Sequence, residues 1–335
     1  AGEMGGDCLN YGCVPSKALI SAARLAHSRG EGAAFGVAPA AAQIDFAAVN
    51  AHVQQVIGAI APHDSQERFE GLGVTVLRGF ARFTGRDRVA VEGTTIRARR
   101  FVIATGSRPF VPPIPGLDGV PYRTNETIFS LTEAPRRLVI LGGGPIGIEM
   151  AQAHRRLGSE VLVLEGTRAL GRDDPEAGAV VLERLRAEGV AIREGAKATA
   201  VDGTAGAITV TLADGTTVEG SHLLVAVGRR ASVEGMGLEA ADVAFTERGV
   251  TVTKGLRSVS NRRVYAVGDA AGGMQFTHLA GYHAGLVIRS ALFRLPVTAR
   301  TDHIPRTTYT EPELAQVGMT EAEARAEGGA VEVVR

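Results

Sequence analysis

The chain has 335 residues, a length typical of about two domains. Hydrophobic residues make up 45% of it, and 36 Lys and Arg balance 36 Asp and Glu, so it lacks the basic excess typical of nucleic-acid binders. No apolar run approaches the roughly 18 residues that a membrane span requires. Cys8 and Cys13 are the only cysteines, which excludes a fold held by a disulfide framework.

The first third of the chain predicts two helices followed by short strands. Apolar spacing predicts a helix over 14–29, with Pro15 in its first turn, and a longer helix over 46–69. Short β-rich runs separated by Gly and Arg then predict strands at 74–77, 81–83, 89–91 and 101–104. Four prolines between 109 and 115 predict a stiff connector and a domain boundary.

Strands and helices alternate from Arg137 onward. Strands are predicted at 138–141, 161–164 and 190–193, with helices at 145–157 and 176–188 between them. A hairpin is predicted around Asp214-Gly215, between strands 208–212 and 217–219. Further strands are predicted at 223–227 and 264–267, and a helix at 279–293. After Pro296 the pattern changes again, into 306–309 and the Pro- and Glu-rich start of a new region.

The two cysteines lie five residues apart, directly before the helix predicted to begin at Val14. A helix N-terminus carries partial positive charge that favours a thiolate, and Lys17 adds positive charge one turn further on. A thiolate is the attacking species in disulfide exchange, so the position favours redox chemistry. Two structural cysteines, or half of a metal site, are the alternatives; a metal site would need further ligands at suitable spacing.

A glycine-rich loop lies between the strand at 138–141 and the helix at 145–157. Gly142, Gly144 and Gly147 form a G-x-G-x-x-G pattern in the strand–helix context that a dinucleotide fingerprint requires. Glu165 ends the next strand, where a carboxylate binds a ribose 2′-hydroxyl and favours NADH. Arg168 and Arg172 would suit a 2′-phosphate, which keeps NADPH as an alternative cofactor. The other interpretation is a glycine-rich turn in an unrelated α/β domain.

The cysteine segment Cys8-x4-Cys13 followed by Val-Pro-Ser-Lys resembles the active-site disulfide of the class I pyridine nucleotide-disulfide oxidoreductases. Four further segments keep the order of that family: 104–109, 228–229, 265–271 and 275–278. The resemblance implies that Cys13 lies next to a flavin, that Cys8 exchanges with substrate, and that both form a redox disulfide. It also implies that Glu149 pairs with Lys17 beside the flavin, which completes the catalytic set of Cys8, Cys13, Lys17 and Glu149.

The resemblance further implies two sets of cofactor contacts. Asp269 alone would suggest an ordinary strand-ending turn, and His278 alone a core or capping histidine. The implied FAD contacts are Gly6, Lys17, Thr105, Gly106, Ser107, Asp269, Gln275, Phe276, Thr277 and His278. The implied NAD contacts are Gly142, Gly144, Pro145, Gly147, Glu149, Glu165 and Gly228. Three residues depart from the family's usual ones: Asp7 replaces Thr, Tyr11 replaces Val, and Pro145 replaces Tyr.

The implied fold class is α/β, with two Rossmann-like dinucleotide-binding domains and an NAD domain inserted into the FAD domain. The expected ranges are 1–130 for an FAD domain without its first βαβ unit, 131–258 for the NAD(P) domain, 259–300 for the returning FAD segment, and 301–335 for the start of an α+β dimerisation domain. We expect an internal fragment, with the family's acid/base His-Glu pair lying beyond residue 335.

The implied function is electron transfer from NADH through FAD to Cys8 and Cys13 and on to a small-molecule disulfide or Hg(II). The run 275–285, with Tyr282 and His283, looks most like the mercuric-reductase branch. Dihydrolipoamide dehydrogenase is the alternative within the family. A non-catalytic NAD-binding or metal-chelating fragment is the alternative from another class. We expect no structural metal, a cytoplasmic homodimer for the full-length protein, and no nucleic-acid or membrane partner.

Overall fold

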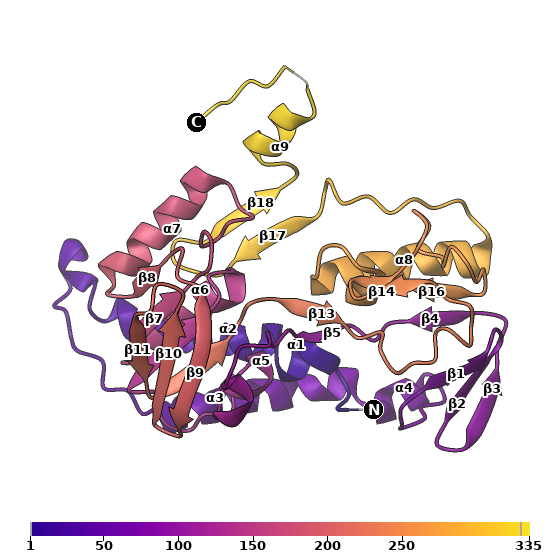
Figure 1. Ribbon diagram of the computed structural model, residues 1–335, viewed down its shortest axis with the longest axis horizontal. Helices are drawn as coiled ribbons and strands as arrows, with labels where there is room; N and C mark the ends of the chain where they lie inside the picture. Colours follow the sequence, from indigo (N-terminus) through magenta and orange to yellow (C-terminus); the bar gives the residue numbers. More distant parts are fainter. Residues whose placement is uncertain (1, 329) are drawn as a thin grey trace. The chain divides into compact units, whose positions relative to one another are not determined.

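The computed structural model describes residues 2–328 and 330–335. The chain forms two compact units, each assembled from separate stretches (Figure 1). The first unit comprises His63–Arg108 and Arg229–Ile304, with the N-terminal residues up to Met4. The second comprises Gly5–Pro62, Pro109–Gly228 and Pro305–Arg335. The four domain ranges expected from the sequence stay a prediction.

A four-stranded parallel sheet is the centre of the second unit (Figure 1). Its order is β12-β6-β7-β8, and the buried strands are rich in Val, Ile and Leu, as parallel strands covered on both faces require. The strands are β6 (Arg137–Leu141), β7 (Glu160–Leu164), β8 (Ala191–Arg193) and β12 (His222–Val225), and the connecting helices are α6 (Pro145–Arg156) and α7 (Pro175–Ala187). The predicted alternation is confirmed, with ends shifted by one or two residues.

A three-stranded antiparallel sheet lies in the same unit, in the order β11-β10-β9. It comprises β9 (Ala198–Thr204), β10 (Ala207–Leu212) and β11 (Thr217–Gly220). The predicted hairpin is confirmed: Gly215 adopts φ 83°, and the Asp214 carboxylate accepts hydrogen bonds from the Thr216 N–H and hydroxyl. Strand β9 was not predicted from the sequence.

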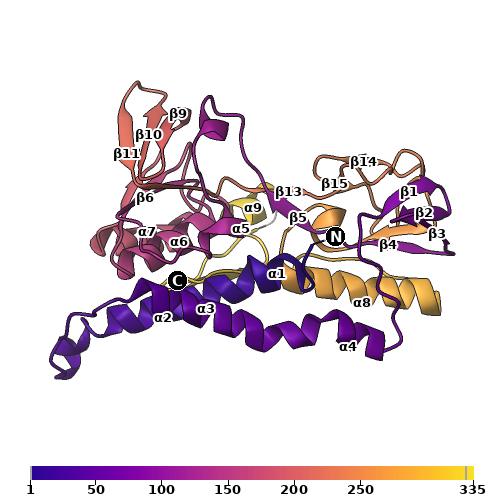
Figure 2. The same cartoon turned by 90° about the horizontal axis from the view of Figure 1, so that it is seen from below.

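The N-terminal stretch of the second unit contains the helices α1 (Gly6–Asn10), α2 (Cys13–Ser28) and α3 (Phe46–Ile60). The short helix α5 (Asn125–Ile128) belongs to its next stretch, 109–228. Helices α2 and α3 run alongside each other (Figure 2). The predicted helix over 46–69 is wrong in its length. It ends at Ile60, and α4 (Gln66–Gly71) begins separately. Pro62 lacks an N–H to continue the helix, and the Ser65 side chain caps α4 by accepting from the Arg68 N–H.

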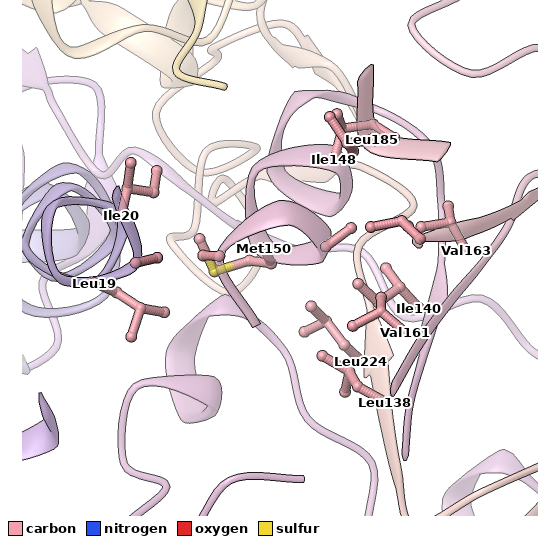
Figure 3. Packing of buried hydrophobic residues seen from close by; sticks show 14 of the residues in the cluster. Leu19, Ile20, Leu138, Ile140, Ile148, Met150, Val161, Val163, Leu185 and Leu224 are labelled. Carbon is pink, nitrogen blue, oxygen red and sulfur yellow. The ribbon is translucent and has the colours of Figure 1, made fainter. Parts of the chain in front are cut away.

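The main core joins α2, α6 and the parallel sheet, with α6 between the other two (Figure 3). Leu19 and Ile20 of α2 face Met150 of α6, while Ile148 faces the strands (Figure 3). Burying one such side chain contributes about 1.5–3 kcal/mol, so this core fixes α2 against α6. The strand residues in this core include Leu138, Ile140, Val161, Val163 and Leu224.

The first unit contains several small sheets and one long helix. An antiparallel sheet is formed by β1 (Arg82–Gly85), β2 (Arg88–Val91) and β3 (Thr94–Arg97). Strand β4 (Phe101–Ile103) pairs in parallel with β16 (Val264–Ala266), and β5 (Ser107–Pro109) pairs with β13 (Arg229–Ala231). The remaining elements are β14 (Phe245–Thr246), β15 (Gly249–Val250) and helix α8 (Thr277–Phe293).

The strand predicted at 74–77 is wrong, because this segment has no regular structure. Val74 is 50% exposed and Leu77 46%, so its apolar residues do not form the buried face that stabilises a strand. After residue 304 the second unit continues with β17 (Pro305–Thr308), β18 (Leu314–Val317) and α9 (Glu321–Ala326). Across residues 2–328 and 330–335, none of the helices has both the length and the apolar character needed to cross a bilayer.

Candidate functional site

The cysteines occupy the short helix α1 and the start of α2. Cys8 lies within α1 and is partly buried, whereas Cys13 is exposed as the first residue of α2. Gly12 precedes it, and a Cβ there would lie 2.9 Å from an Asp7 carboxylate oxygen. The Asn125 side-chain amide donates to Asp7 Oδ1 at 3.1 Å and to the Tyr11 carbonyl at 3.2 Å. The segment is therefore fixed with Cys13 at a helix N-terminus, where the dipole favours a thiolate.

Lys17 and Glu149 form an ion pair between α2 and α6. Lys17 Nζ donates to Glu149 Oε2 at 2.8 Å, and the Glu149 side chain is only 8% exposed. The other carboxylate oxygen, Oε1, accepts from the Tyr309 backbone N–H at 2.9 Å. The contact between Lys17 and Glu149 that the resemblance implied is present. Sequence reasoning missed the Tyr309 donor, which lies 160 residues from Glu149.

A second side chain of α6 binds the same C-terminal segment. Gln152, one turn after Glu149, donates to the Glu311 carbonyl at 2.9 Å and accepts from the Glu311 N–H at 2.8 Å. Arg156 donates to the Glu311 carboxylate at 2.5 Å. Two polar residues three apart within the otherwise apolar stretch 147–153 were the sequence signal for this contact. Without a known fold, that signal does not identify the partner segment.

The glycine loop has the close backbone contacts that its pattern predicts. Gly142 adopts φ 108°, and a Cβ there would lie 2.5 Å from the Ala226 carbonyl oxygen. At Gly147 a Cβ would lie 2.0 Å from the Gly142 carbonyl oxygen. Gly144 differs, since its φ is −75° and a Cβ would meet nothing within 4 Å. Neither strain nor packing requires glycine at this helix cap, so the open space in front of Gly144 fits an approaching pyrophosphate.

Glu165 lies directly after β7 and faces the glycine loop. Its Oε2 accepts from the Gly143 N–H at 2.8 Å, and its Oε1 accepts from the Thr167 N–H at 2.8 Å and hydroxyl at 3.0 Å. Three donors fix the carboxylate, and an ionised carboxylate has about four acceptor positions in all. Arg168 donates instead to the Gly171 and Asp173 carbonyls. The geometry fits a ribose hydroxyl better than a 2′-phosphate, which Glu165 would repel.

Two predicted flavin residues meet in the first unit. Ser107, on β5, donates its hydroxyl to Asp269 Oδ2 at 2.6 Å. Arg229 Nε donates to Ser107 Oγ at 2.7 Å, and its Nη2 donates to the Ser107 carbonyl at 2.9 Å. Asp269 follows β16 in a 3-10 turn, Gly268–Ala271, and is half-buried. This carboxylate retains acceptor capacity, which fits a hydroxyl-bearing ligand such as the ribityl chain of FAD.

His283 holds the turn that carries Asp269. Its Nδ1 accepts from the Gly268 N–H at 3.2 Å. Burial lowers the pKa of His283, which keeps the ring neutral and able to accept at this nitrogen. The sequence singled out His283 only as a branch marker, so this supporting contact was missed.

The other predicted flavin residues occupy loops and a helix start. Gly106 adopts φ 67°, and the Thr105 hydroxyl donates to the Ser232 carbonyl at 2.6 Å. Phe276 caps α8 and stacks on His278 at 5.3 Å between ring centroids. Gln275 is half-buried and Thr277 begins α8. The remaining predicted FAD residues, Gly6 and Lys17, belong to the second unit. Two predicted NAD residues also lie there: Pro145 is at the first position of α6, and the Gly228 carbonyl accepts from the Phe110 N–H at 2.9 Å.

A βαβ unit with a glycine-rich loop before its helix, together with Cys8 in α1 and Cys13 at the start of α2, is typical of a nucleotide-dependent thiol oxidoreductase. Residues 2–284 match the family described as pyridine nucleotide-disulphide oxidoreductase, and residues 304–335 match its dimerisation domain. The chain belongs to this family of FAD-containing, NAD(P)H-dependent disulfide oxidoreductases.

The chain is similar to curated mercuric reductases and dihydrolipoyl dehydrogenases. A mercuric reductase from Streptomyces lividans is 36% identical over 331 residues, covering 96% of this chain and 70% of the relative. A dihydrolipoyl dehydrogenase from Thermus scotoductus is 37% identical over 356 residues, covering 99% of this chain and 73% of the relative. Among solved structures, the HOCl-induced flavoprotein disulfide reductase RclA from Escherichia coli matches with a TM-score of 0.84 and 28% identity, covering 98% of this chain and 73% of that one. The chain spans 52% to 70% of the mercuric reductases it matches.

Proposed function

We propose that this chain is the redox core of an enzyme that passes electrons from NADH, through FAD, to a disulfide between Cys8 and Cys13, and then to Hg(II). The observation that carries this proposal is the position of Cys13 as the first residue of α2, one turn before Lys17, whose ammonium is fixed by the buried Glu149. A helix N-terminus and a nearby cation both stabilise a thiolate.

The nicotinamide cofactor binds at the glycine loop. Gly144 leaves room for the pyrophosphate, whose charge the N-terminus of α6 stabilises. Glu165 binds the ribose hydroxyl and selects NADH, since its carboxylate is fixed by Gly143 and Thr167. Replacing Glu165 by Ala should raise KM for NADH about tenfold. It should also reduce the preference for NADH over NADPH. An unchanged NADH/NADPH ratio of kcat/KM would contradict this assignment.

In the first unit, the residues that would hold FAD are Asp269 and Ser107, together with Thr105, Gly106 and the 275–278 segment. When bound, it supplies the two-electron chemistry that connects a nicotinamide with a thiol pair. There Asp269 contributes a carboxylate with acceptor capacity left for a ligand hydroxyl. In the second unit, the family resemblance implies Gly6 and Lys17, and Lys17 contributes a cation that Glu149 fixes. His283 keeps the Asp269 turn in place.

Cys8 and Cys13 complete the transfer as a dithiol. With a disulfide acceptor, the Cys8 thiolate attacks one sulfur, forms a mixed disulfide and releases the first product thiol. The Cys13 thiolate then attacks the Cys8 sulfur, which releases the second thiol and restores the Cys8–Cys13 disulfide. With Hg(II), both thiolates bind the ion as the soft ligands it prefers. Transfer of their two electrons to Hg(II) then forms the Cys8–Cys13 disulfide and releases Hg(0). In the full-length protein, the segment matching the dimerisation domain would support a homodimer.

A dihydrolipoyl dehydrogenase is the second candidate, because relatives of that name are as similar to the chain as the mercuric reductases. It would use the same cysteines to oxidise a dithiol and reduce NAD⁺. The test follows NADH oxidation by the full-length holoenzyme with an Hg(II)–thiol complex and, separately, with lipoamide. Turnover that requires Hg(II) and disappears in Cys13→Ala supports the first candidate. Turnover with lipoamide alone supports the second, and the absence of both contradicts the proposed acceptors.

A further inference from the structure

Tyr309 contacts both members of the Lys17–Glu149 pair. Its ring lies against the Lys17 ammonium, with Nζ 4.2 Å from the ring centroid, while its backbone N–H donates to Glu149 Oε1 at 2.9 Å. Lys17 Nζ is therefore bounded by a carboxylate at 2.8 Å and by an aromatic face. A cation over an aromatic ring is stabilised electrostatically, and the ring also restricts a long, flexible side chain.

The segment that carries Tyr309 is itself firmly held by the second unit. Thr308 and Thr310 on either side are buried, while Tyr309 is 40% exposed. Glu311 exchanges two hydrogen bonds with Gln152, and Arg24 of α2 donates to the Thr310 carbonyl at 3.1 Å and to Glu313 at 2.7 Å. These contacts fix the backbone independently of the Tyr309 ring, so the ring can be removed without releasing the segment.

We propose that Tyr309 is a positioning residue for the redox reaction, because its ring holds the Lys17 ammonium in place while its peptide N–H holds Glu149. This inference rests on the proposed function, in which Lys17 provides the cation beside the flavin. It also assigns a role to residues 304–335 within their own subunit, since the part of the chain that matches the dimerisation domain contacts the ion pair directly.

The first measurement tests the contact without requiring activity. The sequence contains only three lysines, Lys17, Lys197 and Lys254. In holoenzyme labelled with ¹³C-lysine, the Lys17 ε-methylene signal, assigned with Lys17→Arg, should be shifted upfield by the ring current of Tyr309. Tyr309→Leu should abolish that shift, Tyr309→Phe should retain it, and the Lys197 and Lys254 signals serve as internal controls.

The second measurement tests the positioning role. In stopped-flow experiments, Tyr309→Leu should lower the rate of flavin reduction by NADH about two- to fivefold, the range typical of a partly exposed cation–π contact, with the Kd for NADH unchanged. Tyr309→Phe should restore the rate, because it keeps the ring. In a Lys17→Met background, Tyr309→Leu should have no additional effect on the rate, because any effect that remains there cannot pass through Lys17.

The outcomes separate this inference from the proposed function. An upfield Lys17 signal together with a rate loss confined to the Lys17-containing background supports the positioning role. A Lys17 signal that Tyr309→Leu leaves unchanged, or a rate loss that persists in Lys17→Met, overturns it. If the wild-type holoenzyme reduced its flavin with NADH but turned over neither acceptor, the proposed acceptors would fail, and both measurements on Tyr309 would still decide its role.

Discussion

The glycine loop before α6 and the cysteine segment before α2 both place a helix N-terminus where negative charge is to be held. They are constructed differently. The loop depends on backbone contacts, with a Cβ at Gly147 only 2.0 Å from the Gly142 oxygen. The cysteine site depends on side chains distant in sequence, since Lys17 and Glu149 are 132 residues apart. In the proposed function, nucleotide binding therefore depends on steric fit, whereas the thiol chemistry depends on charges that the tertiary fold brings together.

The largest effect should come from the thiol, and it should leave the loop unaffected. Replacing Cys13 by Ser removes the second nucleophile of the exchange, so NADH oxidation coupled to a disulfide or Hg(II) should fall by about 10³-fold or more. The Kd for NADH should stay within a factor of two, because the glycine loop does not depend on Cys13. Steady-state kinetics and NADH titration of the holoenzyme measure the two quantities. A large change in NADH affinity would show that the two regions are not separable.

Within the loop, two glycines should respond differently to the same added methyl group. Gly147→Ala places a Cβ against the backbone of Gly142, which cannot shift without straining the loop. The substitution should therefore lower the free energy of unfolding by about 3 kcal/mol. Gly144→Ala has open space, so its unfolding free energy should be unchanged while KM for NADH rises about tenfold. Urea denaturation and initial rates provide both values.

Equal destabilisation by the two substitutions would mean that Gly144 is required by the fold. Normal NADH binding in Gly144→Ala would mean that the open space in front of it does not receive the pyrophosphate. Either result would contradict the idea that steric fit at the glycine loop governs nucleotide binding.

Helix α6 joins the two regions, and a buried histidine lies near its C-terminal end. Burial, and secondarily the charge of His222, lower the pKa of His154 from 6.5 to about 4. Its ring stacks on Phe46 of α3, and neither ring nitrogen has a hydrogen-bond partner among the described residues. The nearby cavity is otherwise lined by apolar groups and Asn50. Protonation of this ring would therefore disrupt the packing of α6 against α2 and α3.

Proton linkage gives the direction in which pH changes the stability of the fold. Between pH 6.5 and 4 the unfolded chain binds a proton that the folded chain does not, so stability is complete above pH 6.5 and is lost as the pH falls. Between pH 7.5 and pH 5, His154 should lower the free energy of unfolding by about 2 kcal/mol. His154→Leu should remove that part of the pH dependence, as measured by urea denaturation at the two pH values. An unchanged pH dependence in His154→Leu would assign the acid sensitivity to other groups.

The same contrast explains what the sequence could predict. The glycine loop, Glu165 and the βαβ alternation follow from local spacing, and the structure has them where they were expected. The Lys17–Glu149 contact came from the family resemblance, and no local rule joins two positions so far apart. The Tyr309 donor, the Gln152–Glu311 bonds and the Arg229–Ser107 contact were missed, because they use backbone groups of distant segments. The break near Pro62 was missed although the sequence marks it, because Pro62 and the polar run 63–68 interrupt the apolar spacing.

The smallest effect should test how Glu165 is oriented. Thr167→Val removes one of three donors, the hydroxyl 3.0 Å from Glu165 Oε1, and keeps the Thr167 and Gly143 N–H groups. This hydrogen bond is exposed, and two backbone donors still hold the carboxylate, so its loss should cost about 0.5 kcal/mol and raise KM for NADH only about two- to threefold. Glu165→Ala serves as the reference for complete loss. If Thr167→Val raised KM as much as Glu165→Ala, a single hydroxyl would control the carboxylate, and the loop would resemble the cysteine site in depending on one side-chain contact. A small effect would show that backbone donors suffice to orient Glu165, as the construction of the glycine loop predicts.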